Sequence, residues 1–168
     1  MKTIALLFVA SLWLSETLAQ DKPLKRPDNI GISDFDSFKN TSFDILTDAD
    51  RLKADTKRVD DAVKQYPTLA GLSVERIKGD YNAIKRLKKE TSDLVEKIPS
   101  LDDQGKQLVE NAKSVTPKLK SIDAVGNTNK SVKALDRAKT SLNETGALLD
   151  TNLKIVTDAL KAQGASID

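Results

Sequence analysis

The sequence contains no cysteine and no histidine among its 168 residues. Without cysteine no disulfide can hold the fold, so a hydrophobic core must do so, and a chain of this length can build one. Without histidine the chain lacks the side chain that most often acts as a general base, activates serine or cysteine nucleophiles, and binds zinc. We therefore expect no enzyme activity, no catalytic residue, no metal site and no cofactor.

Aromatic residues and unbalanced charge are also scarce. The chain has 27 Lys and Arg residues against 25 Asp and Glu residues, a formal net charge of +2, and the two signs are interspersed. Such a pattern is typical of solvated helix surfaces and argues against nucleic acid as a partner. Carboxylates one helical turn apart, such as Asp44 and Asp48, are accordingly interpreted as surface charges. Beyond Phe8 and Trp13, the aromatic residues are Phe35, Phe38, Phe43, Tyr66 and Tyr81.

Residues 1–19 have the three-part pattern of a secretory signal peptide. Lys2 supplies a positive start, Ile4–Leu14 is an apolar run too short to span a bilayer, and Thr17-Leu18-Ala19 resembles a cleavage site. We therefore expect a secreted, extracellular protein without a transmembrane segment.

The two ends of the mature chain differ in composition from its centre. Residues 20–41 contain two prolines, a glycine and scattered aspartates, and predict a flexible lead-in. Within it, Lys25-Arg26 fits either a processing site or an ordinary basic pair, and the proline that follows favours the ordinary pair. The polar residues 163–168 predict a disordered tail. A helical bundle domain is expected between these ends, over residues 42–162.

Apolar residues recur through this domain in steps of three and four, which is the period of amphipathic α-helices. The pattern predicts helices over about 42–66, 73–98, 101–125 and 128–162, separated by prolines or a glycine. Because the connections are short, neighbouring helices should run antiparallel. The expected fold is all-α, an up-and-down antiparallel bundle of four long helices. The last helix has the longest stripe, Val132, Leu135, Ala138, Leu142, Leu149, Leu153, Val156 and Leu160.

Pro117 interrupts the third predicted helix. Thr116 and Pro117 make a good N-cap and first-position pair, so the chain could restart there as a fifth helix that Gly126 closes. Alternatively one helix continues through a kink, because the apolar stripe keeps its register across the proline.

Three Asn-x-Ser/Thr sequons are candidate glycosylation sites, at Asn40, Asn129 and Asn143. The first two are expected near loops and the third in the middle of a helix. The densest basic run fits a solvated helix face or, alternatively, contact with anionic glycans or lipid head groups. This run consists of Lys85, Arg86, Lys88 and Lys89.

The apolar stripes fit either a plain core or a bundle that can expose them. They are rich in Ala and Thr and poor in aromatic residues, which predicts incomplete filling, and Gly79, Gly146 and Pro117 interrupt three helices. Gly79 in particular predicts a close helix contact or a local loosening. Such a bundle could hold an elongated cavity between helices, or open to lay its stripes on an apolar surface.

Several short motifs follow one another along the domain. They are Asp48-Ala49-Asp50-Arg51-Leu52, an Ala-Val-x-x-Tyr-Pro segment at Ala62–Pro67, Gly71, Val115-Thr116-Pro117-Lys118-Leu119, and a long final helix with Leu153 and Leu160. This order resembles the fungal hydrophobic surface-binding protein A family, which includes cell-wall galactomannoproteins. The similarity covers about Asp44–Ala162.

The resemblance implies a non-enzymatic helical bundle, secreted or in the cell wall, that adsorbs to apolar surfaces and helps to recruit a secreted esterase. It also implies a cavity between helices for a fatty-acid-like lipid, with Tyr81 as a polar handle. The candidates for lining this cavity are Val63, Ile77, Tyr81, Ile84, Leu108, Val115, Leu119, Leu142, Leu149 and Leu153. The alternative function is a protein-interaction module, a structural wall component or an effector, which would use the charged helix faces.

Overall fold

The computed structural model describes residues 23–66 and 71–166, and its regular structure in these ranges is entirely helical. The elements are α1 (Ser33–Val63), α2 (Val74–Val95), α3 (Ile98–Ala112) and α4 (Lys118–Ala162). The expected all-α class is confirmed. The expected signal peptide, residues 1–19, lies outside the described ranges.

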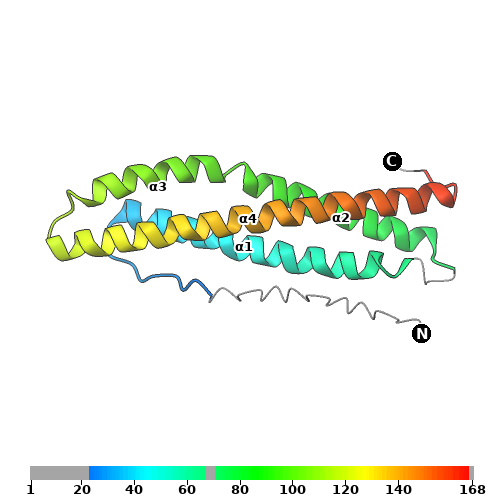
Figure 1. The fold of residues 1–168 in the computed structure, drawn as a ribbon, viewed down its shortest axis with the longest axis horizontal. Coiled ribbons are helices and arrows are strands. Elements are labelled where there is room, and N and C mark those ends of the chain that lie inside the picture. The colour runs from blue at the N-terminus through cyan, green and yellow to red at the C-terminus, as the bar shows by residue number, and fades with distance from the viewer. Residues whose placement is uncertain (1–22, 67–70, 167–168) are drawn as a thin grey trace, which may run out of the picture.

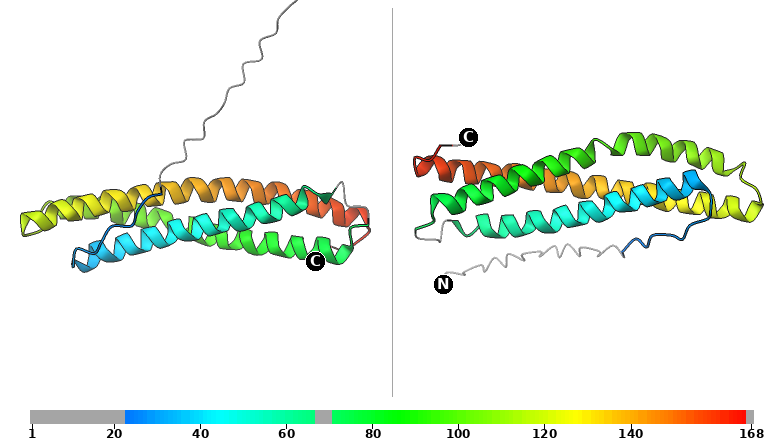
Figure 2. Two further views of the ribbon diagram at one scale, coloured as in Figure 1. Left: turned by 90° about the horizontal axis from the view of Figure 1, so that it is seen from below. Right: turned by 180° about the vertical axis from the view of Figure 1, so that it is seen from behind.

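The helices form three antiparallel segments, not four. α1 runs along the molecule in one direction, α2 and α3 follow one another back, and α4 returns beside them (Figure 1). α4 is 45 residues long and packs against each of the other three helices, as the views in Figure 2 also show. The predicted antiparallel bundle of four long helices is therefore corrected to an up-down-up bundle whose middle segment has two pieces.

The join between α2 and α3 explains this difference. Glu96 and Lys97 both keep right-handed helical backbone angles, so the chain bends there and does not reverse. Pro99 lies in the first turn of α3, where its missing N–H has no partner to lose. Ile98 is 1% exposed and anchors the join in the core. The predicted helix end at residue 98 is wrong because α2 ends at Val95, while Ile98 and Pro99 belong to α3, and the antiparallel turn expected there is also wrong.

The second reversal of the chain occurs before Pro117, whose backbone is extended. Of the two alternatives that the sequence left open at this proline, a break or a kink, the structure has the break, whereas the predicted end at Gly126 is wrong because α4 continues through it. Thr128 and Ser131 each donate a 2.8 Å hydrogen bond to the carbonyl four residues earlier, so these polar side chains are satisfied within the helix. Both are buried against the bundle, so tertiary packing outweighs the local turn signal.

The N-terminal end of the bundle is longer than its apolar periodicity predicts. α1 begins at Ser33, within the lead-in expected over 20–41, and Phe35 and Phe38 are buried on it. The carboxylate of Asp36 accepts 2.9 Å hydrogen bonds from the backbone N–H groups of Ile30 and Gly31. The extended residues before α1 are thus held at its first turn.

The residues after α4 are also packed, at least as far as 166. Gly164 has a φ of 67°, a left-handed conformation that lets the chain fold back after the helix. The N–H of Ala165 then donates to the carbonyl of Leu160 at 3.0 Å, and the side chain of Gln163 donates to the carbonyl of Leu72 at 2.9 Å. The start of the predicted disordered tail, 163–168, is therefore part of the bundle.

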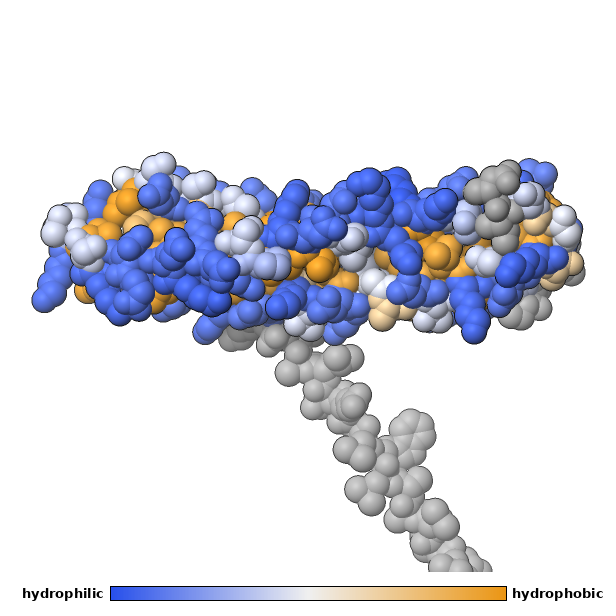
Figure 3. All heavy atoms as spheres, turned by 90° about the horizontal axis from the view of Figure 1, so that it is seen from above, coloured by the Kyte–Doolittle hydropathy of each residue, from blue (hydrophilic) through white to orange (hydrophobic). Residues whose placement is uncertain are grey.

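Hydrophilic side chains cover most of the molecular face drawn in Figure 3, and hydrophobic side chains show between them as separate patches. Within the ranges that the structure describes, no helix has the length and apolarity needed to cross a membrane.

Candidate binding surfaces

The ten residues predicted to line a lipid cavity do not surround a common space. Six of them are core residues no more than 5% exposed: Val63, Ile77, Ile84, Leu108, Leu142 and Leu149. Three are partly buried and pack against the core: Tyr81, Val115 and Leu153. Leu119, in contrast, is 76% exposed. The ten are spread from the turn before α4 at one end of the molecule to the α1–α2 connection at the other.

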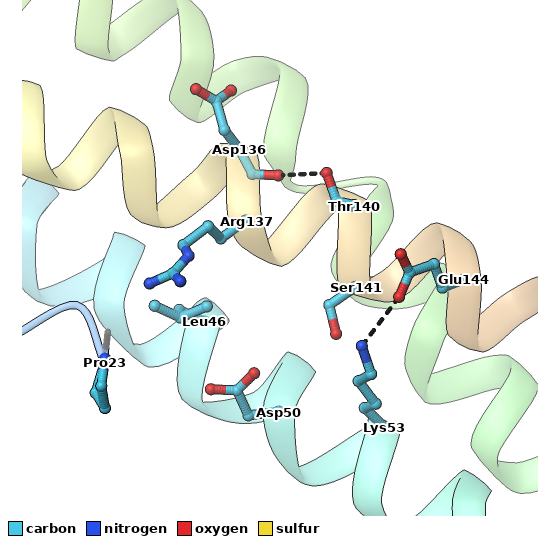
Figure 4. Close-up of a pocket in the computed structure, with 9 residues that line it drawn as sticks. All are labelled: Pro23, Leu46, Asp50, Lys53, Asp136, Arg137, Thr140, Ser141 and Glu144. Atoms are coloured by element: carbon cyan, nitrogen blue, oxygen red, sulfur yellow. Dashed lines mark hydrogen bonds and ion pairs between the residues drawn. The ribbon is translucent and has the colours of Figure 1, made fainter. Parts of the chain in front are cut away.

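Surface grooves lie elsewhere and are mostly polar. The groove between α1 and α4, drawn in Figure 4, has a volume of about 550 Å³. An ion pair crosses it, with Lys53 Nζ 3.0 Å from Glu144 Oε2. Its lining contains one aliphatic side chain, Leu46, so it is poorly suited to an acyl chain. The other lining residues are Pro23, Asp50, Asp136, Arg137, Thr140 and Ser141.

Two further grooves are less polar. Gly105, Val109 and Val132 lie in a groove of about 440 Å³ between α3 and α4, which charged residues surround. Ile77 lies in a groove of about 510 Å³ at the opposite end of the bundle. Of the ten cavity candidates, Ile77 alone lines one of these three grooves.

The middle of the bundle contains buried polar atoms instead of a hollow. Five side-chain atoms, on α1, α2 and α4, are inaccessible to solvent and have no hydrogen-bond partner among the described residues. The side chains that carry them are at most 8% exposed. These atoms are Thr56 Oγ1, Thr91 Oγ1, Ser141 Oγ, Thr145 Oγ1 and Asn152 Nδ2.

Contacts between the helices place these atoms in neighbouring layers. A methyl group added at Gly146 would lie 4.0 Å from Thr91 Cγ2, so Thr91 of α2 faces the α4 turn that contains Thr145. The Lys53–Glu144 ion pair brings the α1 turn before Thr56 to the same level. The sequence predicted incomplete filling of the apolar stripes; the structure shows buried Thr, Ser and Asn side chains between the helices, of which Ser141 also lines the groove between α1 and α4. We name the residues Thr56, Thr91, Ser141, Thr145 and Asn152 the polar middle.

The charged helix faces are largely neutralised by ion pairs. Arg51 lies 3.1 Å from Glu90 and also contacts Asp48 and Asp55, at 3.7 and 3.5 Å. The hydrogen bond to Glu90, and then the nearby negative charges, raise the pKa of Arg51. Lys64 and Lys106 likewise have raised pKa values because of hydrogen bonds to Asp60 and Asp103.

The basic run 85–89 is engaged in the same way. Arg86 pairs with Glu90 at 3.3 Å, Lys89 pairs with Asp93 at 2.6 Å, and Lys88 pairs with Asp150 of α4. The remaining ammonium group, of Lys85, lies 5.4 Å from the centre of the Tyr81 ring. These contacts favour the interpretation of the run as a helix surface over the interpretation as an anion site.

Tyr66 joins the last turn of α1 to α2. Its hydroxyl donates a 2.8 Å hydrogen bond to the carboxylate of Asp80, which also contacts Arg76 at 3.5 Å. Burial, followed by the hydrogen bond and the negative charge of Asp80, raises the pKa of Tyr66 well above its ordinary value. Near neutral pH the phenol is therefore a hydrogen-bond donor that ties the two helices together.

The most exposed large aliphatic side chains of the described ranges lie at the start of α4. Leu119 and Ile122 are 76% and 66% exposed. The sequence pattern placed both in a core stripe, and Ile122 was not a site candidate. The pattern could not show that the first turns of α4 lie at the end of the bundle, beyond the partner helices (Figures 1 and 2).

All three sequons lie within helices. Asn40 is on α1, while Asn129 and Asn143 are on α4, so the expected loop positions of Asn40 and Asn129 are wrong. α1 starts earlier and α4 continues further back than predicted. Asn129 and Asn143 are exposed and Asn40 is half-buried. Their glycosylation stays a prediction.

Residues 23–66 and 71–166 contain no group of three or more acidic side chains arranged to hold a metal ion. No protein-family model, no curated protein and no solved structure matches the chain.

Proposed function

We propose that the protein binds hydrophobic surfaces and fatty-acid-like lipids without catalysis, by separating its three helix segments. The observation that carries this proposal is the polar middle. Each segment has an apolar stripe long enough to cover a surface, yet the stripes meet one another across side chains that leave polar atoms unpaired. The interior of the closed bundle is therefore stabilised by apolar contacts but contains polar atoms without hydrogen-bond partners.

The energies involved support opening. A buried polar atom without a partner costs about 1–3 kcal/mol, whereas a whole domain is stable by about 5–15 kcal/mol. Five such atoms together therefore cost an amount comparable with the net stability of a domain. When the segments separate at an interface, these atoms regain water while the neighbouring aliphatic side chains contact the surface. Opening then costs much less than it would for an all-apolar interior.

Binding after opening also fits the placement of the ten cavity candidates. Because six of them lie in the core and the ten do not share one of these grooves, a fatty-acid-like ligand would reach the buried ones when the segments move apart. Recruitment of a secreted esterase and location in the cell wall rest on the resemblance alone, whereas secretion is also expected from the pattern of residues 1–19. The charged faces support the alternative, a protein-interaction module, less well because many of their charges pair with one another.

A cross-linking experiment tests this function. Because the chain lacks cysteine, Lys53→Cys/Glu144→Cys creates one thiol pair that a short bis-maleimide can join between α1 and α4. We expect the cross-linked protein to lose at least tenfold in saturable adsorption to uncharged polystyrene particles and in binding of a fluorescent fatty acid. Lys88→Cys/Asp150→Cys allows α2 to be cross-linked to α4, and it tests whether binding also requires the middle segment to separate from α4.

The matched control is a cross-link within one helix. Lys89→Cys/Asp93→Cys joins two positions one turn apart on α2 and places no constraint on helix separation. This linked control and all unlinked variants should bind like the original protein. Equal binding by the linked α1–α4 and α2–α4 variants would exclude opening, and a lack of saturable binding by the original protein would remove the function itself.

A further inference from the structure

The turn between α3 and α4 presents an apolar tip with a positive border. Leu119 and Ile122 are three residues apart on α4, so their exposed side chains share one face of the helix. Lys118 and Lys120 precede and follow Leu119, about 100° to either side of it around the helix axis. Residues 113–122 contain three lysines and no acidic residue. We call these ten residues the α4 tip.

The tip carries positive charge without acidic residues of its own, although lysines elsewhere on α4, such as Lys133 and Lys154, also lack an ion pair with the described residues. Lys118 and Lys120 form no ion pair with any residue in the described ranges, unlike Arg51, Arg86, Lys88 and Lys89. Lys113 pairs with Glu110 at 2.6 Å, and Asp123 follows directly after the tip. The tip therefore combines the two most exposed large aliphatic side chains with two unpaired ammonium groups.

The tip is also held in a defined position. The hydroxyl of Ser121 donates a 2.6 Å hydrogen bond to the carbonyl of Ala112 at the end of α3. The N–H of Lys120 donates to the carbonyl of Pro117 at 2.9 Å, which closes the first turn of α4. A tip fixed at one end of an elongated bundle can meet a flat surface end-on (Figures 1 and 2).

We propose that the α4 tip docks on anionic phospholipid membranes. Leu119 and Ile122 enter the acyl boundary of the bilayer, while Lys118 and Lys120 extend to the lipid phosphates with their aliphatic stems along the apolar layer. The charge pattern favours this occupant, because a ridge with cations on both flanks complements a uniformly anionic head-group layer. Docking needs no separation of the helix segments, so it goes beyond the proposed function and does not depend on it.

Vesicle flotation of the full chain tests this inference. The original protein should bind vesicles of phosphatidylcholine with one-third phosphatidylserine, should bind pure phosphatidylcholine weakly, and should dissociate as salt is raised. Leu119→Ser/Ile122→Ser should lower the partition constant at least tenfold, because it removes both inserted side chains. Lys118→Gln/Lys120→Gln should lower it about 25-fold, at roughly fivefold for each lysine.

Matched controls come from the other half of α4. Ile155, 41% exposed, and Lys154 offer an aliphatic and a basic position away from the tip, and Ile155→Ser and Lys154→Gln should leave vesicle binding unchanged. All the substituted side chains are exposed, so the circular dichroism and unfolding midpoint of each variant should match those of the original protein. Equal loss in the controls, or unchanged binding by either tip variant, would overturn the proposal.

The result is distinguishable from a failure of helix opening. The cross-linked Lys53→Cys/Glu144→Cys protein should still bind anionic vesicles through the tip, even where it no longer adsorbs to polystyrene. Equal binding to phosphatidylserine and pure phosphatidylcholine vesicles would refute the anionic membrane as the occupant. A tip that captures a purified protein partner but no vesicle would refute it too.

Discussion

Two regions of the same core are packed in opposite ways. Near the start of α1, Phe38 lies against Gly105 of α3 and Val132 of α4, so closely that a methyl group at Gly105 would be 2.9 Å from Phe38 Cζ and 3.0 Å from Val132 Cγ2. In the polar middle, Thr and Asn side chains are equally buried but leave polar atoms unpaired. We name Phe38, Gly105 and Val132 the phenylalanine region. It has no room for a methyl group at Gly105, whereas the polar middle contains polar atoms without hydrogen-bond partners.

This difference assigns separate tasks to the two regions. An aromatic side chain in a gap left by glycine fits only one arrangement of three helices, so it fixes how α1, α3 and α4 lie against one another. Side chains such as Thr56 and Asn152 gain hydrogen bonds whenever water reaches them, so they favour separation. We infer that the phenylalanine region holds the closed bundle together while the polar middle lets it open.

The largest expected effect comes from emptying the phenylalanine region. Phe38→Ala removes a side chain that is 1% exposed and leaves a cavity between three helices, so we expect it to lower the free energy of unfolding by about 3–5 kcal/mol. Denaturant titration measures this change. Leu119→Ala, at a 76% exposed position, is the control and should change stability by no more than about 0.5 kcal/mol. A small loss for Phe38→Ala would mean that the region does not hold the bundle.

A pair of glycines sharpens the same comparison. Gly105→Ala should destabilise the protein by about 1–3 kcal/mol, because the new methyl group must displace Phe38 or Val132. Gly79→Ala should stabilise it by up to about 1 kcal/mol, since a methyl group there meets no atom of the described residues within 4 Å and alanine favours the helix. The two midpoints of thermal unfolding should therefore move in opposite directions. Equal shifts would show that Gly105 is not the tight contact.

The polar middle should respond in the opposite sense to the phenylalanine region. Asn152→Leu replaces an unpaired amide by an aliphatic group of similar size, so we expect a gain of about 1–3 kcal/mol in the free energy of unfolding. Asn143→Leu, on the exposed face of the same helix, should be nearly neutral. If Asn152→Leu destabilises the protein, its amide has a bonding role in the closed bundle, and the case for easy opening is lost.

Much of this architecture could be predicted from the sequence, because periodicity reports which face of a helix is buried. The spacing of apolar residues by three and four predicted the helical class, and Thr116-Pro117 indicated the place where the chain breaks between α3 and α4. The sequence does not reveal that α4 continues through Gly126, where a turn was predicted. Its polar residues look like a loop, and only the contact of α4 with α1 and α3 shows that Thr128 is buried.

The candidate sites were harder to predict, for a physical reason. A stripe of apolar residues looks the same whether a partner helix covers it or the bundle ends there. Leu119 belongs to the stripe of the third predicted helix and Leu149 to that of the last one, and both stripes have the same period, yet Leu119 is exposed and Leu149 is fully buried. The polar middle was visible as Thr and Asn residues in the stripes, but the lack of bonding partners depends on how three segments face one another.

The smallest predicted effect concerns the end of the bundle where Tyr66 binds Asp80. Because the folded-state pKa of Tyr66 is raised above the ordinary value of about 10, its contribution to stability is complete below that pH and is lost as pH rises above it. In Tyr81→Phe protein that lacks residues 1–19, Tyr66 is the one tyrosine, and phenolate absorbance should appear at higher pH than in unfolded protein. Asp80→Asn should lower that midpoint by removing the negative charge. A midpoint equal to the unfolded one would show that this end of the bundle is as loosely held as the polar middle.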